Sequence, residues 1–315
     1  MNFWEKAEEK LQTGVRLILM IVIKSEGSSP GKPGFSMMVA DDGEIWGSIG
    51  GGAMEYRLTE KCRRLFNEEV MAPFIQKQDH HPDSTEDNSG MICSGIQWIA
   101  FYPLYNSSLN LIKNIVTIQD NKTEKVVSFT EKGIKIIKPD SNIAYPISSV
   151  TNDSWEYSTQ PGLKNRLYIF GAGHVSLALS KMAKDLDFQV EVFDNRKTIN
   201  TFDDNKYADK KTVINYANAG NYVKEGNHIF VVIMTFAHKS DTIVLKQVIK
   251  KKLRYLGMMG SEMKVESVFG MLKQEGYEEK DITRVDAPIG LPINSITPAE
   301  IAVSIMAKII QVMNS

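Results

Sequence analysis

The chain has 315 residues, of which 43% are hydrophobic and 24% are charged. These proportions are typical of a soluble globular protein, and the length allows two domains. The formal net charge is −1, so no overall field attracts nucleic acid or an anionic membrane. The N-terminal segment carries charges where a signal peptide needs an apolar core, and the apolar run 15–23 is too short to span a membrane. We therefore expect a cytoplasmic protein that binds neither nucleic acid nor membrane.

The first half of the sequence predicts an α+β domain over residues 1–150, and the polar, Pro-Gly-containing segment 151–165 predicts a linker. A polar, turn-rich stretch at 76–92 predicts a surface loop. Hydrophobic periodicity predicts the remaining elements of this half. They are helices at 2–12, 53–66 and 109–118, strands at 15–24, 35–40, 45–48 and 96–102, and a hairpin of 125–129 with 134–137.

Two loops of small residues flank the hairpin formed by 35–40 and 45–48. One contains Ser28, Ser29 and Lys32, and the other contains the triple glycine Gly50, Gly51 and Gly52, which opens a helix. Three adjacent glycines cost backbone entropy, which favours a backbone cradle for an anionic or bulky planar ligand over a flexible flap. Glu55, in the first helical turn, complements the helix dipole.

The segment around residue 80 invites a metal interpretation because it contains Asp79, His80, His81 and Asp83. Adjacent histidines in a flexible loop are poorly preorganised for a metal ion, so we predict no metal site. Cys93 lies between glycines before a strand, and two interpretations stay open: an accessible thiol or a buried small hydrophobe. With Cys62 it makes two cysteines, too few for a disulfide framework or a cysteine zinc site.

Residues 166–196 have the layout of a dinucleotide-binding βαβ unit. An apolar run meets Gly171 and Gly173, a periodic helical segment follows, and a second apolar run ends on Asp194. Gly171 suits the tight turn, and Gly173 suits a close approach of backbone to phosphate at the helix N-terminus. Asp194 is placed to hydrogen-bond a ribose hydroxyl. The third glycine position of the motif is Ser176.

The α/β alternation continues with strands at 212–215, 229–234 and 255–258 and a helix at 242–250, which predicts an open parallel sheet over 166–315. Ligands of such sheets bind outside the carboxyl ends of the strands. We therefore expect three turns to converge there: 171–174, 235–241 and 260–264. The last offers Gly260, Ser261 and Lys264 as a second anion site. His174 and His238 lie in these turns, either as catalytic or metal-binding groups or as structural histidines.

A set of short motifs, spread over nearly the whole chain, resembles the XdhC/CoxI family of accessory factors that mature xanthine dehydrogenase and carbon monoxide dehydrogenase. The motifs are GSSP at 27–30, GSIGGGAME at 47–55, GMICSG at 90–95, FGAGHV at 170–175, FDNR at 193–196, TFAHKSD at 235–241, YLGMMGSEMK at 255–264, and APIGLPI with TPAEIAVSI at 287–305. The chain departs from the family pattern at Gly31-Lys32, at Ser94, and at Phe236, which stands where the family has a histidine.

The resemblance implies an N-terminal cofactor domain, a C-terminal Rossmann-like domain and assembly as a homodimer. It implies a protein that binds molybdenum cofactor, holds it while a cysteine desulfurase supplies the sulfido ligand, and passes it to an apo molybdenum hydroxylase. Such a protein is a chaperone rather than an enzyme. The cofactor is molybdopterin or its cytosine dinucleotide form.

On this interpretation the cofactor-binding candidates are the small-residue loops, the glycine turn and the sheet-edge residues described above, and Cys93 is a soft contact near molybdenum. They are Ser28, Ser29, Lys32, Gly50, Gly51, Gly52, Glu55, Cys93, Gly171, Gly173, His174, Asp194, Arg196, Thr235, His238, Asp241, Gly260, Ser261 and Lys264. The alternatives are an NAD(P)-dependent oxidoreductase, with His238 as general acid or base, and a nucleotide-sensing regulator. If the protein is catalytic, His238 and Cys93 are the candidate catalytic residues.

Overall fold

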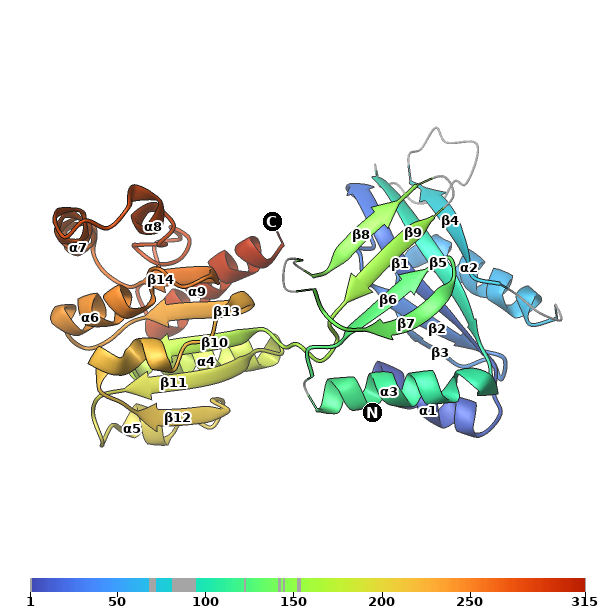
Figure 1. The fold of residues 1–315 in the computed structure, drawn as a ribbon, viewed down its shortest axis with the longest axis horizontal. Coiled ribbons are helices and arrows are strands. Elements are labelled where there is room, and N and C mark those ends of the chain that lie inside the picture. The colour runs from blue at the N-terminus through green and yellow to red at the C-terminus, as the bar shows by residue number, and fades with distance from the viewer. Residues whose placement is uncertain are drawn as a thin grey trace. The chain divides into compact units, whose positions relative to one another are not determined.

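The chain folds into two compact units, Met1–Leu163 and Lys164–Ser315. In the computed structural model the described residues are 2–67, 72–80, 95–121, 123–140, 143, 145–151 and 154–314. Within these ranges the first unit contains two sheets and the second contains one, and each unit has its own helices (Figure 1).

The N-terminal unit contains a five-stranded antiparallel sheet in the order β3-β2-β1-β5-β4. Its strands are β1 (Leu17–Gly27), β2 (Ser36–Ala40), β3 (Ile45–Gly47), β4 (Phe74–Asp79) and β5 (Gly95–Leu104). The helices of this unit are α1 (Phe3–Gln12), α2 (Gly52–Leu65) and α3 (Leu109–Asp120).

Both faces of this sheet are covered, which explains why β1 is apolar along most of its length. Alternate side chains such as Leu19 and Ile21 pack with α1 and α3, while Ile18 and Met20 pack under α2. In an alternating strand, burial of both faces requires a continuous apolar run. Helices α1 and α3 lie side by side on their face of the sheet (Figure 1).

A second, four-stranded antiparallel sheet follows in the order β7-β6-β9-β8. Its strands are β6 (Val126–Thr130), β7 (Gly133–Ile137), β8 (Ile147–Val150) and β9 (Trp155–Thr159). Strand β9 lies inside the segment 151–165 that we expected to be a linker. It belongs to the first unit because it pairs with β6 and β8, and Trp155 and Tyr157 are buried in the core.

The C-terminal unit is built on a parallel sheet in the order β12-β11-β10-β13-β14. Its strands are β10 (Arg166–Phe170), β11 (Gln189–Asp194), β12 (Lys210–Val213), β13 (Gly226–Ile233) and β14 (Leu253–Met258). The helices are α4 (His174–Asp185), α5 (Asn200–Asp203), α6 (His238–Val248), α7 (Glu262–Gln274), α8 (Glu279–Thr283) and α9 (Pro298–Met313).

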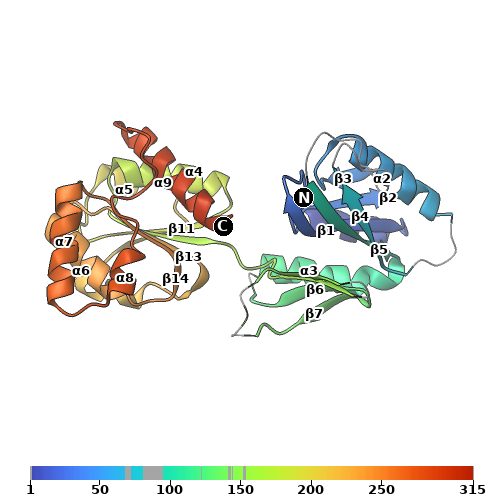
Figure 2. The same cartoon turned by 90° about the horizontal axis from the view of Figure 1, so that it is seen from above.

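Helices cover both faces of this sheet, with α4 and α9 on one side and α6 and α7 on the other (Figure 2). Residues of β10 alternate between the two cores: Leu167 and Ile169 face α4, and Tyr168 and Phe170 face the α6 side. The strand order reverses direction between β10 and β13, and ligands of such sheets bind at that point. The predicted α/β fold class, with a Rossmann-like parallel sheet in the C-terminal half, is confirmed.

Two local predictions differ from the structure. Strand β4 occupies Phe74–Asp79, the start of the segment that we expected to be a polar loop, and helix α6 begins at His238 instead of Thr242. The rest of the predicted loop, including His81, lies outside the described residues, and so does Cys93.

Candidate functional site

The glycine turn after β10 has the geometry that a phosphate site requires. Gly171 is buried with φ of +110°, and a Cβ on it would lie 2.2 Å from the carbonyl oxygen of Met234, so only glycine fits there. Gly173 is the N-cap of α4 and no side chain caps that helix. A Cβ on Gly173 would meet nothing within 4 Å. The first N–H groups of α4 therefore adjoin open space, where an anion can accept their hydrogen bonds.

Asp194 lies at the end of β11 and its side chain is fully buried beneath this turn. Its carboxylate accepts hydrogen bonds from the backbone N–H of Ala172 (2.8 Å) and of Arg196 (3.0 Å), and from the Arg196 guanidinium (two bonds of 2.9 Å). Burial raises the pKa of Asp194, but these donors outweigh it and hold the pKa below its usual value. The hydrogen bond to a ribose hydroxyl stays a prediction, and both carboxylate oxygens already have partners.

Arg196 forms an exposed cation–aromatic pair at the same edge of the sheet. Its side chain is 39% exposed, and its guanidinium lies 5.3 Å from the ring centre of Phe236, which follows β13. Phe236 is 86% exposed, an unusual position for a large aromatic side chain. The two residues join the turns after β11 and β13, although the turn after β11 was not among the three that we expected to converge.

The turns after β13 and β14 meet through a buried ion pair. Asp241 is fully buried and accepts hydrogen bonds from the backbone N–H (2.8 Å) and hydroxyl (2.7 Å) of Thr235. Its other oxygen pairs with the ammonium of Lys264, which also donates to the carbonyl oxygen of Met259 (2.8 Å). Lys264 is therefore held by the chain itself, and its cation contributes to the fold at this edge.

The remaining candidates at this edge differ in exposure. Ser261 caps α7, its hydroxyl accepting from the backbone N–H of Lys264 (3.4 Å) beside Gly260, so the start of α7 is satisfied by its own side chain, unlike the start of α4. His174 and His238 are the first residues of α4 and α6, and both side chains are exposed. Within the described residues the imidazole of His238 contacts no acid that could orient it as a catalytic base.

A groove of about 560 Å³ runs from His174 along α4 to the start of α9. Residues of α4, of the start of α9 and of the segment 204–207 line it. This volume is that of a small-molecule site. The groove therefore extends the open space at the start of α4.

In the N-terminal unit a side chain already fills the predicted glycine cradle. One oxygen of Glu55 accepts hydrogen bonds from the Ser48 hydroxyl (2.6 Å) and from the backbone N–H groups of Ile49 (2.7 Å), Gly50 (3.1 Å) and Gly51 (2.8 Å). Burial raises the pKa of Glu55, but the hydrogen bonds from these four donors lower it by more than that, so the pKa lies below its usual value. A ligand anion would have to displace this carboxylate.

Gln97 on β5 joins the two small-residue loops and was not among the predicted residues. Its buried amide oxygen accepts from the Ser29 hydroxyl (2.7 Å) and the backbone N–H of Gly31 (3.0 Å), and its amide nitrogen donates to the carbonyl oxygen of Ile49 (3.1 Å). A polar residue at a buried strand position was the signal that could have identified it. Ser29 is thus part of the scaffold, whereas Ser28 and Lys32 are exposed.

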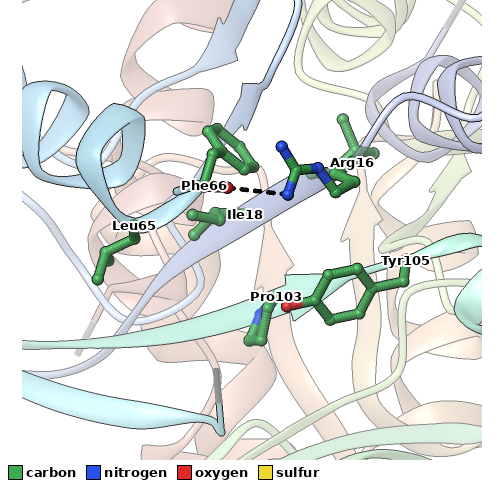
Figure 3. Close-up of a pocket in the computed structure, with 7 residues that line it drawn as sticks. Arg16, Ile18, Leu65, Phe66, Pro103 and Tyr105 are labelled. Atoms are coloured by element: carbon green, nitrogen blue, oxygen red, sulfur yellow. Dashed lines mark hydrogen bonds between the residues drawn. The ribbon is translucent and has the colours of Figure 1, made fainter. Parts of the chain in front are cut away.

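A small hollow lies beside the C-terminus of α2, and Figure 3 shows the side chains that line it. Arg16 donates to the carbonyl oxygen of Phe66 (2.8 Å) and so satisfies an unpaired group at the end of the helix. The hollow measures about 10 Å³, which is room for no more than one water molecule. It therefore cannot hold a cofactor.

Within the described residues no three His, Cys, Asp or Glu side chains are grouped as metal ligands. Cys62 lies on the buried face of α2, and burial raises the pKa of its thiol to about 12. Among the helices of the described ranges, none has the length and apolar content that crossing a membrane requires.

Comparisons with known proteins match both units of the chain. Residues 11–72 match the XdhC and CoxI family, and residues 167–309 match the XdhC Rossmann domain. An uncharacterized Escherichia coli protein, YqeB, is 24% identical over 320 residues; the match covers all of this chain but 47% of YqeB, so the chain spans about half the length of that relative.

Two further relatives are matched over almost their entire length. A Bacillus subtilis protein, named as a probable subunit of xanthine dehydrogenase, is 23% identical over 328 residues, covering 98% of this chain and 97% of the relative. The crystal structure of a xanthine dehydrogenase from Bacillus halodurans matches with a TM-score of 0.70 and 24% identity, over 99% of this chain and 96% of that one, which shows a shared fold. Taken with the two family matches in this order along the chain, these findings show that the protein belongs to the XdhC and CoxI family.

Proposed function

We propose that this protein is an accessory factor for a xanthine-dehydrogenase-type molybdenum hydroxylase, and that it binds molybdenum cofactor before insertion. The observation that carries the proposal is the family match of both units, together with an end-to-end relative named as a probable part of xanthine dehydrogenase. The finer steps belong to the proposal: sulfuration of the held cofactor by a cysteine desulfurase, delivery to the apo-hydroxylase, assembly as a homodimer, and a cytoplasmic location.

The carboxyl edge of the C-terminal sheet suits the phosphate of a pterin cofactor. The uncapped start of α4 supplies N–H donors, and Gly173 leaves room for an anion to approach them. The adjoining groove of about 560 Å³ offers space for a pterin-sized group. When bound, the cofactor supplies the molybdenum centre of the hydroxylase, and the residues of this chain hold and shelter it.

The test is metal and pterin analysis of protein purified without oxygen from a host that makes molybdenum cofactor. We expect molybdenum and pterin in stoichiometric amounts in the wild type. Gly173→Ala should lower both at least about tenfold, because a methyl group there occupies space that the phosphate needs but clashes with nothing in the protein. Gly270→Ala is the matched control, since its Cβ also meets nothing within 4 Å and it lies in α7, away from the turn.

A wild-type protein that carries neither molybdenum nor pterin would refute cofactor binding. Full cofactor content in Gly173→Ala would refute the assignment of the phosphate to the start of α4. Delivery is tested separately, by mixing the loaded protein with apo-hydroxylase and measuring the appearance of xanthine oxidation.

An NAD(P)-dependent oxidoreductase is the second candidate, because the glycine turn and the parallel sheet are those of a dinucleotide-binding unit. In that case His238, at the exposed start of α6, is the general acid or base. Turnover of NAD(P)H with a hydride acceptor, lost in His238→Gln, would favour this function over cofactor delivery.

A further inference from the structure

The acid that follows the second strand of the parallel sheet is not free to bind a ribose. In sheets of this kind, a carboxylate at that position hydrogen-bonds the 2′-hydroxyl of NAD, whereas a nearby arginine accommodates the 2′-phosphate of NADP. Oδ1 of Asp194 accepts from the backbone and Nε of Arg196, and Oδ2 accepts from Ala172 and from Nη2 of Arg196. The carboxylate is fully buried, so no oxygen faces a ligand.

The guanidinium of Arg196 takes the exposed position instead. Its Nε and Nη2 edge is fixed on the carboxylate, and a planar guanidinium held in this way directs its Nη1 side away from that partner. Nη1 has no hydrogen-bond partner in the described ranges. Lys197, the next residue, is also exposed and adds a second cation. The ion pair with Asp194 therefore orients a cation towards the place where a ribose substituent would lie.

Phe236 gives this cation an aromatic neighbour. The ring is 86% exposed and lies 5.3 Å from the guanidinium carbon of Arg196. Exposed aromatic and guanidinium planes are surfaces on which nucleobases stack. The pair thus supplies a contact for a nucleobase next to a contact for an anion. This combination suits a nucleotide better than a free phosphate ion, which has no base.

We infer that the C-terminal unit binds an adenine dinucleotide bearing a phosphate on the ribose, and that it selects NADP(H) over NAD(H) through Arg196. The inference is one of binding and includes no hydride transfer. A dinucleotide and the pterin cofactor would both place a phosphate at the start of α4, so the inference is tested on protein that contains no molybdenum cofactor.

The experiment is titration calorimetry of the full chain, produced in a host without molybdenum cofactor, with NADPH, NADH and 2′,5′-ADP. We expect NADPH to bind about tenfold to a hundredfold more tightly than NADH, because one charge-assisted contact to phosphate is worth that much. The nucleotide 2′,5′-ADP, which lacks the nicotinamide, should retain the preference over 5′-AMP. Arg196→Ala should abolish the preference, and Arg196→Lys should retain part of it.

Lys224→Ala is the matched control, since this exposed lysine precedes β13 at the opposite edge of the sheet and should leave the preference unchanged. Equal affinities for NADPH and NADH in the wild type would overturn the inference without the need for any variant. A preference that survives Arg196→Ala in folded protein would also overturn it, and so would an absence of nucleotide binding. None of these results would affect the molybdenum analysis, which measures a different ligand on a different preparation.

Discussion

Replacing Glu55 by glutamine should destabilise the N-terminal unit, because one carboxylate oxygen holds the whole glycine-rich turn before α2. That oxygen accepts from Ser48 and from three consecutive backbone N–H groups. Hydrogen bonds to a charged acceptor contribute about 1.5–3 kcal/mol each. The group is only partly buried and the amide can still accept some of these bonds, so we expect Glu55→Gln to lose about 2 kcal/mol of unfolding free energy.

The loss should depend on pH in a defined direction. The donors hold the pKa of Glu55 below its ordinary value of 4.5, so the carboxylate stabilises the folded state above that pH. This contribution disappears as the pH falls through the lowered pKa of the folded state. The difference between wild type and Glu55→Gln should therefore be constant near neutral pH and shrink below about pH 4.5.

Tryptophan fluorescence during urea unfolding measures this effect in the correct unit. All four tryptophans of the chain belong to Met1–Leu163, so the signal reports that unit alone. They are Trp4, Trp46, Trp98 and Trp155. Glu60→Gln is the control, because Glu60 lies on the same helix but only pairs with Arg63 on the surface, and it should change stability by less than about 0.5 kcal/mol. A Glu55→Gln protein as stable as Glu60→Gln, or a difference that does not shrink as the pH falls below 4.5, would refute the reasoning.

Three further predictions test the scaffold of the two units. Gln97→Leu should lower the unfolding free energy of the N-terminal unit by about 3 kcal/mol, since it leaves the buried N–H of Gly31 and carbonyl oxygen of Ile49 unpaired and removes one of the two partners of the Ser29 hydroxyl. Urea unfolding followed by tryptophan fluorescence measures this loss, and a value below about 1 kcal/mol would contradict the prediction. Gly171→Ala should lower the unfolding free energy by about 2–4 kcal/mol, and Gly173→Ala by less than about 1 kcal/mol. The reason is that only Gly171 has a positive φ and a neighbouring carbonyl oxygen with which a Cβ would clash. Thermal unfolding followed by circular dichroism compares the two variants, and equal losses would argue against this geometry. In a Cys93→Ser background, Cys62 should react with a thiol reagent at pH 8 only after unfolding, because burial raises the pKa of its thiol to about 12. Rapid labelling of the native protein would contradict this, because it would show that the thiol is accessible in the folded state.

Periodic patterns with clear end signals were predictable from the sequence. The strand–turn–helix–strand unit over 166–196 has an apolar run, a glycine turn and an acid in fixed order, and each has a local physical cause. The final helix begins where Thr297, Pro298 and Glu300 form a capping box, and the structure contains those hydrogen bonds. Such features depend on neighbours in sequence and are recognisable without the fold.

Elements stabilised by distant partners were not predictable in the same way. Strand β4 is an edge strand with polar residues such as Lys77, so it lacks the apolar run of a central strand. Strand β9 lies in a polar segment and forms because β6 and β8 pair with it. Helix α6 extends back to His238 without a side-chain cap, so no residue in the sequence marks its beginning.

The site divides along the same line. The open start of α4 follows from the glycine spacing, whereas the partners of the charged candidates follow from tertiary contacts. Asp194 forms an ion pair with Arg196, and Asp241 forms one with Lys264. Glu55 accepts hydrogen bonds from the backbone N–H groups of its own glycine-rich turn. Residue type and spacing indicate where charged side chains gather, but not which of them are paired within the protein and so are unavailable to a ligand.

The carboxylate in the N-terminal glycine turn acts in effect as a ligand that the protein carries with it. Only a few residues separate Glu55 from the N–H groups of the glycine-rich turn. The effective concentration of its carboxylate there is therefore on the order of millimolar or higher, and a free anion must compete against it. A free phosphate or carboxylate ion well below this concentration therefore occupies the turn less often than the Glu55 carboxylate does. A cofactor that did enter the glycine-rich turn would displace the carboxylate and loosen the first turn of α2. Binding at the glycine-rich turn would therefore change the order of that helix.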